Sequence, residues 1–157
     1  MNAFLLNING AIRKVEADPA TPLIYVLRNR LGLMGAKLGC GLEQCGACAV
    51  IADGERVSSC VRTVSEFEGR AITTIEGLAE EGELNPVQRA FLDTCAAQCG
   101  YCTSGLIVAL TAFLEAEERP DRRGALKALE GHLCRCGAHA DVLRAVERLV
   151  SEAADGG

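Results

Sequence analysis

The sequence predicts an α+β protein, with a strand-rich first half followed by a helical second half. Before residue 76, apolar and polar residues alternate at several places, and a period of two is typical of strands. From Pro86 onward the apolar residues recur every three to four positions, which indicates helices. A run of strands followed by a run of helices is the order found in α+β proteins. We expect residues 1–76 and 86–157 to form two domains, joined by an acidic linker over 77–85.

Two hairpins and a final strand are expected in the first domain. Residues 4–8 alternate between apolar and polar, and the Asn9-Gly10 pair after them readily adopts the positive φ angles of a type I′ turn. Asp53-Gly54 gives the same signal after the apolar residues 49–51. The β-branched residues of 71–75 predict the last strand.

Five helices are expected in the whole chain. Thr21 and Pro22 predict an N-cap and a first helical residue, for a helix that runs to about Leu31. Four more are expected in the second domain, where the apolar residues have a helical period: 86–96, 103–117, 121–132 and 139–153.

Eight of the nine cysteines fall into two sets of four. The first set is Cys40, Cys45, Cys48 and Cys60, and the second is Cys99, Cys102, Cys134 and Cys136. The first spacing matches the Cys-x4-Cys-x2-Cys pattern of plant-type [2Fe–2S] ferredoxins, apart from a shorter gap before the last cysteine. Glycines crowd the same loop and let its backbone wrap closely around a cluster.

Zinc is the alternative for each set, because soft thiolates bind zinc as well as iron–sulfur clusters. The first spacing favours a [2Fe–2S] cluster, whereas the second, a Cys-x2-Cys pair and a Cys-x-Cys pair, suits zinc about equally. Two cluster sites in so small a chain indicate one-electron transfer. The chain offers no nucleophile–base pair, so any substrate chemistry is expected on another polypeptide.

Several other residues near the cysteines invite a prediction. Cys95 is expected to be a small buried residue on a helix. His132 and His139 flank the last cysteine pair, and we expect each to hydrogen-bond near a cluster or to lie on the surface. Lys37, three residues before Cys40, and Arg135, between two ligands, are the charges expected to tune the reduction potentials, and a solvated surface position is the alternative for Lys37.

Composition excludes some classes of function. The formal net charge is −5, and no basic stripe is available for nucleic acid. The first residues have no basic region followed by a long apolar run, and no segment approaches the length of a membrane span. A cysteine-rich chain of this kind is expected in a reducing compartment, the cytoplasm, where thiols bind metals more often than they form disulfides.

Three motifs together resemble those of the small iron–sulfur subunit of molybdenum hydroxylases, the xanthine oxidase and aldehyde oxidoreductase family. Residues 39–48 read GCGLEQCGAC, residues 98–105 read QCGYCTSG, and residues 133–137 read LCRCG. Their order and spacing agree with the family over essentially the whole chain. The resemblance implies that both cysteine sets bind [2Fe–2S] clusters. It also implies a plant-ferredoxin-like β-grasp domain over 1–76 and a four-helix domain over 86–157.

The resemblance further implies a partner. A large subunit would carry molybdopterin, as the cytosine dinucleotide, and Gln98 and Cys136 would contact the pterin. Electrons would leave molybdenum through the helical cluster, then the N-terminal cluster, and then reach an FAD subunit or a cytochrome c.

The residues around the third motif depart from the usual family pattern. Gly131-His132 stands before it and Ala138-His139 after it, as in bacterial hydroxylases of N-heterocyclic aromatics such as nicotinate dehydrogenase and isoquinoline oxidoreductase. This favours a nitrogen heterocycle as substrate of the complex. An aldehyde or xanthine is the alternative substrate, and a free two-cluster ferredoxin is the alternative function.

Overall fold

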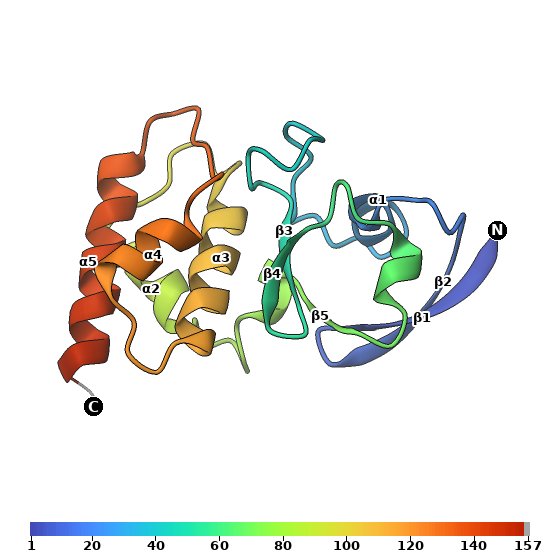
Figure 1. Cartoon of the computed structure of the whole chain (residues 1–157), viewed down its shortest axis with the longest axis horizontal. Helices are drawn as coiled ribbons and strands as arrows, with labels where there is room; N and C mark the ends of the chain where they lie inside the picture. Colours follow the sequence, from blue (N-terminus) through green and yellow to red (C-terminus); the bar gives the residue numbers. More distant parts are fainter. Residues whose placement is uncertain (156–157) are drawn as a thin grey trace.

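A computed structural model describes residues 1–155 and has a sheet with one helix on one side and four helices on the other (Figure 1). The predicted α+β class is therefore confirmed. Residues 156–157, the end of the predicted second domain, lie outside the described residues. Among residues 1–155, no helix combines the length and the apolar character that a membrane crossing needs.

The sheet contains five strands in the spatial order β2-β1-β5-β3-β4. The strands are β1 (Asn2–Ile8), β2 (Ala11–Ala17), β3 (Ala49–Ala52), β4 (Glu55–Ser58) and β5 (Ala71–Thr73). Only β1 and β5 run parallel; the other neighbours are antiparallel. Both predicted hairpin turns are confirmed: φ is 52° and 76° at Asn9 and Gly10, and 52° and 84° at Asp53 and Gly54.

Helix α1 (Leu23–Asn29) covers one face of the sheet. Leu23, Val26 and Leu27 are buried there, in a core that includes Leu6 and Ile72 from the central strands. The segment between α1 and β3, residues 30–48, forms a long loop that carries three of the cysteines.

Thr21 was predicted to cap α1, and this prediction is wrong. The helix begins at Leu23 and no side chain caps its first turn. The Thr21 carbonyl accepts a 2.8 Å hydrogen bond from Val64 N, and Leu23 N donates to the Arg62 carbonyl at 2.9 Å. Residues 21–23 therefore run as an extended segment beside 62–64, and that pairing supplies the bond that a cap would have supplied.

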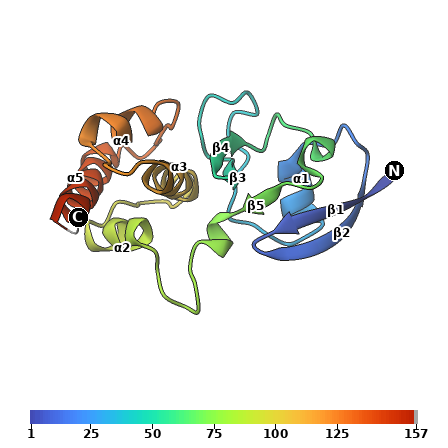
Figure 2. The same cartoon turned by 60° about the horizontal axis from the view of Figure 1, so that its bottom comes forward.

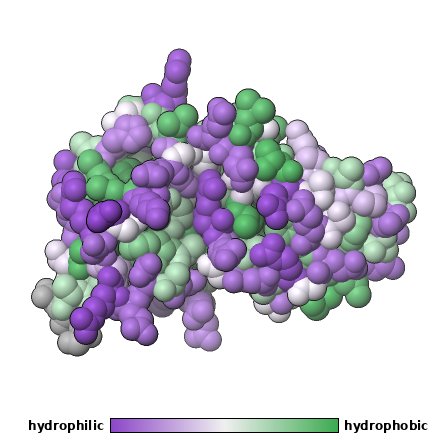
Figure 3. Space-filling view, viewed as in Figure 1, coloured by the Kyte–Doolittle hydropathy of each residue, from purple (hydrophilic) through white to green (hydrophobic). Residues whose placement is uncertain are grey.

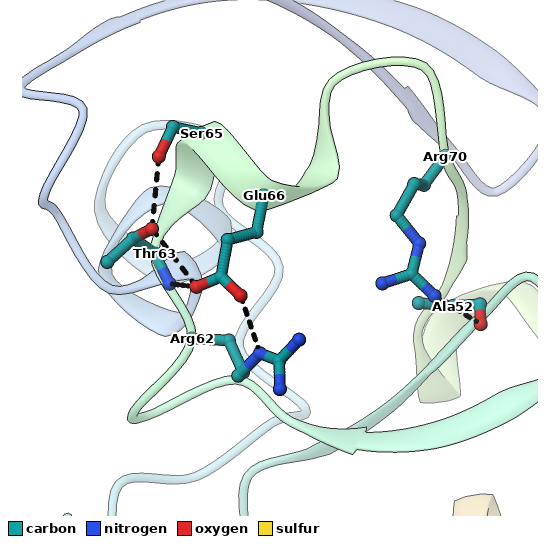
Figure 4. A network of polar contacts seen from close by, with 6 residues as sticks. All are labelled: Ala52, Arg62, Thr63, Ser65, Glu66 and Arg70. Carbon is teal, nitrogen blue, oxygen red and sulfur yellow. Dashed lines mark hydrogen bonds and ion pairs between the residues drawn. The ribbon is translucent and has the colours of Figure 1, made fainter.

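A short 3-10 helix, η1 (Val64–Phe67), follows this pairing and closes it with a polar network. Glu66 accepts a 2.7 Å hydrogen bond from Thr63 N and pairs with Arg62 Nε at 2.8 Å (Figure 4). The reciprocal bonds of Thr63 and Glu66 form a capping box, which fixes the chain just beyond Cys60.

The second half consists of four helices, as predicted: α2 (Pro86–Asp93), α3 (Thr103–Ala116), α4 (Arg122–Ala128) and α5 (His139–Asp155). Asn85 caps α2, because its side chain accepts from Gln88 N at 2.8 Å while Gln88 Oε1 accepts from Asn85 N at 2.9 Å. A shared core includes Phe91, Leu110 and Val146 from α2, α3 and α5.

The two halves meet where α3 lies against β3 (Figures 1 and 2). All four residues of β3 are buried, because Val50 and Ala52 enter the core under α1 while Ala49 and Ile51 enter the helical core. A Cβ added to Gly105 of α3 would overlap the Gly46 carbonyl oxygen and lie 3.0 Å from its carbon. Glycine at this position allows the two halves to approach so closely.

Candidate metal centres

The first cysteine set lies in the loop between α1 and β3 and just after β4. Cys48 precedes β3 and Cys60 follows β4, so the β3–β4 hairpin brings these two thiols together in a small buried cluster with Ile24. Cys40 and Cys45 form a second pair within the loop, where Cys40 N donates to Cys45 Sγ at 3.3 Å. The structure therefore gathers this set as two pairs.

Backbone N–H groups point at the sulfur atoms of the loop. Leu42 N and Gln44 N each donate to Cys40 Sγ at 3.3 Å, and these bonds lower the pKa of Cys40 to about 7. Positive φ angles of 65° at Gly41 and 60° at Glu43 turn the chain so that it can curl around the sulfur. Since the thiolate is the form that binds a metal, the loop is built to hold a metal-bound sulfur.

The other pair of this set is more deeply buried. Burial, and after it contact with the Cys60 thiol, raises the pKa of Cys48 to about 11. Ser59 Oγ donates to the Cys48 carbonyl at 2.6 Å and Ser59 N donates to the same oxygen at 3.3 Å, which holds the two segments in register. A bound iron would take the place of the proton that these buried sulfurs otherwise keep.

The second set also forms two pairs, at the end of the helical half. Hydrogen bonds from Tyr101 N and from the Cys136 thiol lower the pKa of Cys99, and both of these thiols are exposed. Burial, and after it contact with the half-buried Cys134 thiol, raises the pKa of Cys102 to about 12. The pairs are thus Cys99 with Cys136 and Cys102 with Cys134, and the helices α3 and α5 begin beside them.

A cavity of about 570 Å³ lies between the two sets. Cys40 and Cys45 line it from one side, and Cys99, Cys102 and Cys134 line it from the other. Among residues 1–155, no three Cys, His, Asp or Glu side chains converge closely enough to ligate one ion. A cluster of two irons, each ligated by its own pair of thiols, does not need that convergence, so the paired arrangement fits it.

Three direct hydrogen bonds join the segments that carry the two sets. Leu133 N donates to the Cys45 carbonyl at 3.1 Å, and Ser104 Oγ donates to the Gly35 carbonyl at 2.7 Å. Tyr101 Oη donates to the Leu38 carbonyl at 2.6 Å. These contacts were not predicted from the sequence, because no local pattern indicates a bond between residues so far apart in the chain.

The residues expected to meet a partner's pterin lie at the surface. Gln98 and Cys136 are both exposed, on the segments that bear the second cysteine set. Arg135 and His139 are also exposed, and both line the cavity between the sets. The surface placement predicted as one alternative for His139 is confirmed.

Lys37 is half-buried and bonded instead of solvated. Its Nζ donates to the carbonyls of Met34 and Gly35, at 2.8 and 2.9 Å. Lys37 therefore braces the backbone that leads into the first cysteine loop.

Two predictions near the cysteines are wrong. Cys95 is exposed with φ at 53°, because α2 ends at Asp93 and Cys95 lies in the turn beyond it. His132 is buried, and neither ring nitrogen has a hydrogen-bond partner. Burial lowers the pKa of His132 to about 4, with a further contribution from Arg56, so the ring is neutral where it packs against Gly46.

Comparisons with known protein families agree with this geometry. Residues 6–79 match the family described as "2Fe-2S iron-sulfur cluster binding domain", and residues 74–147 match the "[2Fe-2S] binding domain". Each match contains one complete cysteine set. Together they decide between iron–sulfur clusters and zinc, in favour of two [2Fe–2S] clusters.

Proteins of similar sequence and structure are parts of oxidoreductases. The chain is 48% identical to one of the subunits of nicotinate dehydrogenase from Pseudomonas putida, over 91% of each chain. It superposes on a chain of quinoline 2-oxidoreductase from Pseudomonas putida 86 with a TM-score of 0.89 and 34% identity, over 99% of this chain and 97% of that one.

A third similarity indicates what such a chain is part of. The aldehyde oxidoreductase of Desulfovibrio gigas has a TM-score of 0.91 and 34% identity, over 100% of this chain but only 18% of that one. The matched region is therefore a small part of a much larger polypeptide, which implies a large catalytic partner for this chain. The chain belongs to the small iron–sulfur subunits of the molybdenum hydroxylase family, which transfer electrons within their complexes.

Proposed function

We propose that the two cysteine sets are the ligands of the two clusters, with one iron for each pair of thiols. Cys40 with Cys45 and Cys48 with Cys60 would hold the first cluster; Cys99 with Cys136 and Cys102 with Cys134 would hold the second. The support is the pairing itself, together with the N–H groups aimed at Cys40, Cys45 and Cys134. Each cluster, when bound, accepts and releases one electron.

The second proposal concerns the partner. Gln98 and Cys136 contact the molybdopterin, as its cytosine dinucleotide, in the large subunit. Their exposure supports this, since a surface group can reach a cofactor held by another chain. Around them, Tyr101 and Leu133 are 47% and 62% exposed, and Leu42 of the first loop is 67% exposed. In Figure 3 some hydrophobic residues lie among hydrophilic ones at the top of the molecule, where the loop before β3 projects.

The order of electron flow follows from that placement. Electrons enter at the second cysteine set, cross the junction between the halves, and leave from the first set to an FAD subunit or a cytochrome c. The residues of this chain contribute burial, N–H bonds to sulfur and fixed positions, each of which affects a reduction potential or a transfer distance.

The substrate of the complex is an N-heterocyclic aromatic compound. Nicotinate and quinoline are both of this class, and they appear in the names of the relatives that match nearly the full length of this chain. An aldehyde is the second candidate, because the aldehyde oxidoreductase has the same fold over the whole of this chain.

We also propose the division into an N-terminal domain over 1–76, a linker over 77–85 and a helical domain over 86–157. Two distinct core clusters support it, one under α1 and one among the helices, although Ala49 and Ile51 of β3 belong to the second. A cytoplasmic location is proposed because ligand thiols must stay reduced to receive iron.

The experiment uses the complex purified from its native host. Anaerobic addition of nicotinate or quinoline should bleach the cluster absorbance, whereas benzaldehyde should not. A faster response to the aldehyde would overturn the substrate proposal.

Gln98→Ala should keep its iron but slow the bleaching, with Cys95→Ser as the control, because Cys95 is exposed and outside both sets. Equal rates in the Gln98→Ala and unaltered complexes would exclude a role for Gln98.

A further inference from the structure

We propose that Tyr101 is a positioning residue that fixes the separation of the two clusters. The proposal rests on the function proposed above, namely that both cysteine sets hold clusters. Tyr101 stands between Cys99 and Cys102 in the sequence, and its hydroxyl reaches across the junction to the other half of the protein.

The contact of Tyr101 joins the two ligand loops directly. Its Oη donates to the Leu38 carbonyl at 2.6 Å, and Leu38 lies two residues before Cys40. The side chain also lines the cavity into which thiols of both sets face. The backbone of Tyr101 therefore lies within the second ligand loop, while its hydroxyl contacts the first.

Tyr101 completes a set of three tethers. Ser104 Oγ bonds the Gly35 carbonyl at 2.7 Å, and Leu133 N bonds the Cys45 carbonyl at 3.1 Å. Three bonds at three separate points fix both the distance and the orientation of one loop relative to the other. Tyr101 is the one of these that comes from within the Cys99–Cys102 segment, so its loss should loosen that segment and leave the others in place.

The position of the hydroxyl makes its role separable from folding. Tyr101 is 47% exposed, so phenylalanine keeps the ring and leaves water to satisfy the Leu38 carbonyl. Tyr101 is thus poorly placed to contribute much to the stability of the core. Both the electron-transfer rate and the magnetic coupling between two clusters fall steeply with their separation, so a small displacement of one loop is measurable.

The test uses the holoprotein with both clusters reduced. Electron paramagnetic resonance measures the spin–spin splitting between the clusters, and iron analysis measures their occupancy. Tyr101→Phe should retain all of its iron and the signal of each separate cluster, but show a weaker and more heterogeneous splitting. The control is Tyr25→Phe, on α1, where the tyrosine is similarly exposed at 41% and far from the second set in the sequence; its splitting should equal that of the unaltered protein.

A second variant moves the loops apart by a different route. Gly105→Ala places a methyl group against the Gly46 carbonyl, and its splitting should fall further than that of Tyr101→Phe. If this variant does not fold, the decision rests on Tyr101→Phe alone. An unchanged splitting in Tyr101→Phe would overturn the proposal, and so would loss of iron, because the tyrosine would then retain a cluster instead of positioning it. If the unaltered protein holds fewer than two clusters, the proposed function is overturned instead.

Discussion

Gly46 shows how strongly a single residue of the first loop depends on the second half. Its φ is 69°, and a Cβ added there would lie 2.6 Å from His132 Cε1 and closer still to other ring atoms. His132 is buried without a hydrogen-bond partner, so its ring is held by packing alone. Gly46→Ala therefore creates both backbone strain and a steric overlap.

We expect Gly46→Ala to destabilise the protein by about 1–3 kcal/mol beyond the backbone strain, and to reduce the iron bound by the first cysteine set. Gly10→Ala is the matched control, because its φ is 76° but nothing lies within 4 Å of the added methyl. Denaturant unfolding and iron analysis of both variants separate the two effects. Equal losses in the two variants would mean that the contact with His132 is unimportant.

At this scale the sequence predicted the chemistry of the site better than its surroundings. Cysteine spacing is local information, and both sets are gathered as pairs. The burial of His132 and the exposure of Cys95 depend on where a helix ends and what packs on it, which no spacing records. The second set was ambiguous between zinc and iron–sulfur until family similarity decided it.

At the scale of elements, the local signals were reliable where the bonds are local. The turns at Asn9-Gly10 and Asp53-Gly54 form because neighbouring residues supply the required φ angles. The start of α1 was predicted wrongly, because Thr21 pairs with a segment some forty positions further along the chain. The capping box of Thr63 and Glu66, at the end of that segment, can be tested by substitution.

Glu66→Gln should lower stability at pH 7 by a few tenths to about 1 kcal/mol, since Glu66 is a partly exposed carboxylate. The hydrogen bond from Thr63 N, with help from Arg62, holds the pKa of Glu66 below its usual 4.5. A carboxylate whose pKa is lowered by folding stabilises the folded state at pH values above its unfolded-state pKa. This contribution is lost as the pH falls through the lowered pKa.

The stability difference between Glu66→Gln and the unaltered protein should therefore shrink below about pH 4.5. Denaturant unfolding followed by far-ultraviolet circular dichroism measures it, with Glu68→Gln on a neighbouring exposed carboxylate as the control. A difference that stays constant between pH 7 and pH 3 would show that the charge of Glu66 does not stabilise the box.

For the whole molecule, β3 is the element that contributes to both cores. Its residues point alternately into the core under α1 and into the helical core, so each half buries apolar surface against this one strand and we expect the halves to unfold together. The sequence predicted a strand here, but it did not predict what packs against the face that bears Ala49 and Ile51. That face is specified by α3, far away in the chain, and by glycines that permit the approach.

Ile51→Ala should destabilise the protein by about 2–5 kcal/mol, because Ile51 is buried in the helical core although it lies in the sheet. Cluster absorbance and helical circular dichroism should be lost together in a single shifted transition. Ile12→Ala, at a position 66% exposed, is the control and should have little effect. Two separate transitions in the Ile51→Ala variant would show that the halves unfold independently.

The metal content of the protein tests most directly whether two separate sets of thiols hold two [2Fe–2S] clusters. Iron and acid-labile sulfide are best counted in the unaltered protein, in Cys45→Ser and in Cys102→Ser. We expect two irons and two sulfides for each of the two cluster-binding domains, and loss of half of each in either variant. Zinc in place of iron, or a full iron content in either variant, would contradict it.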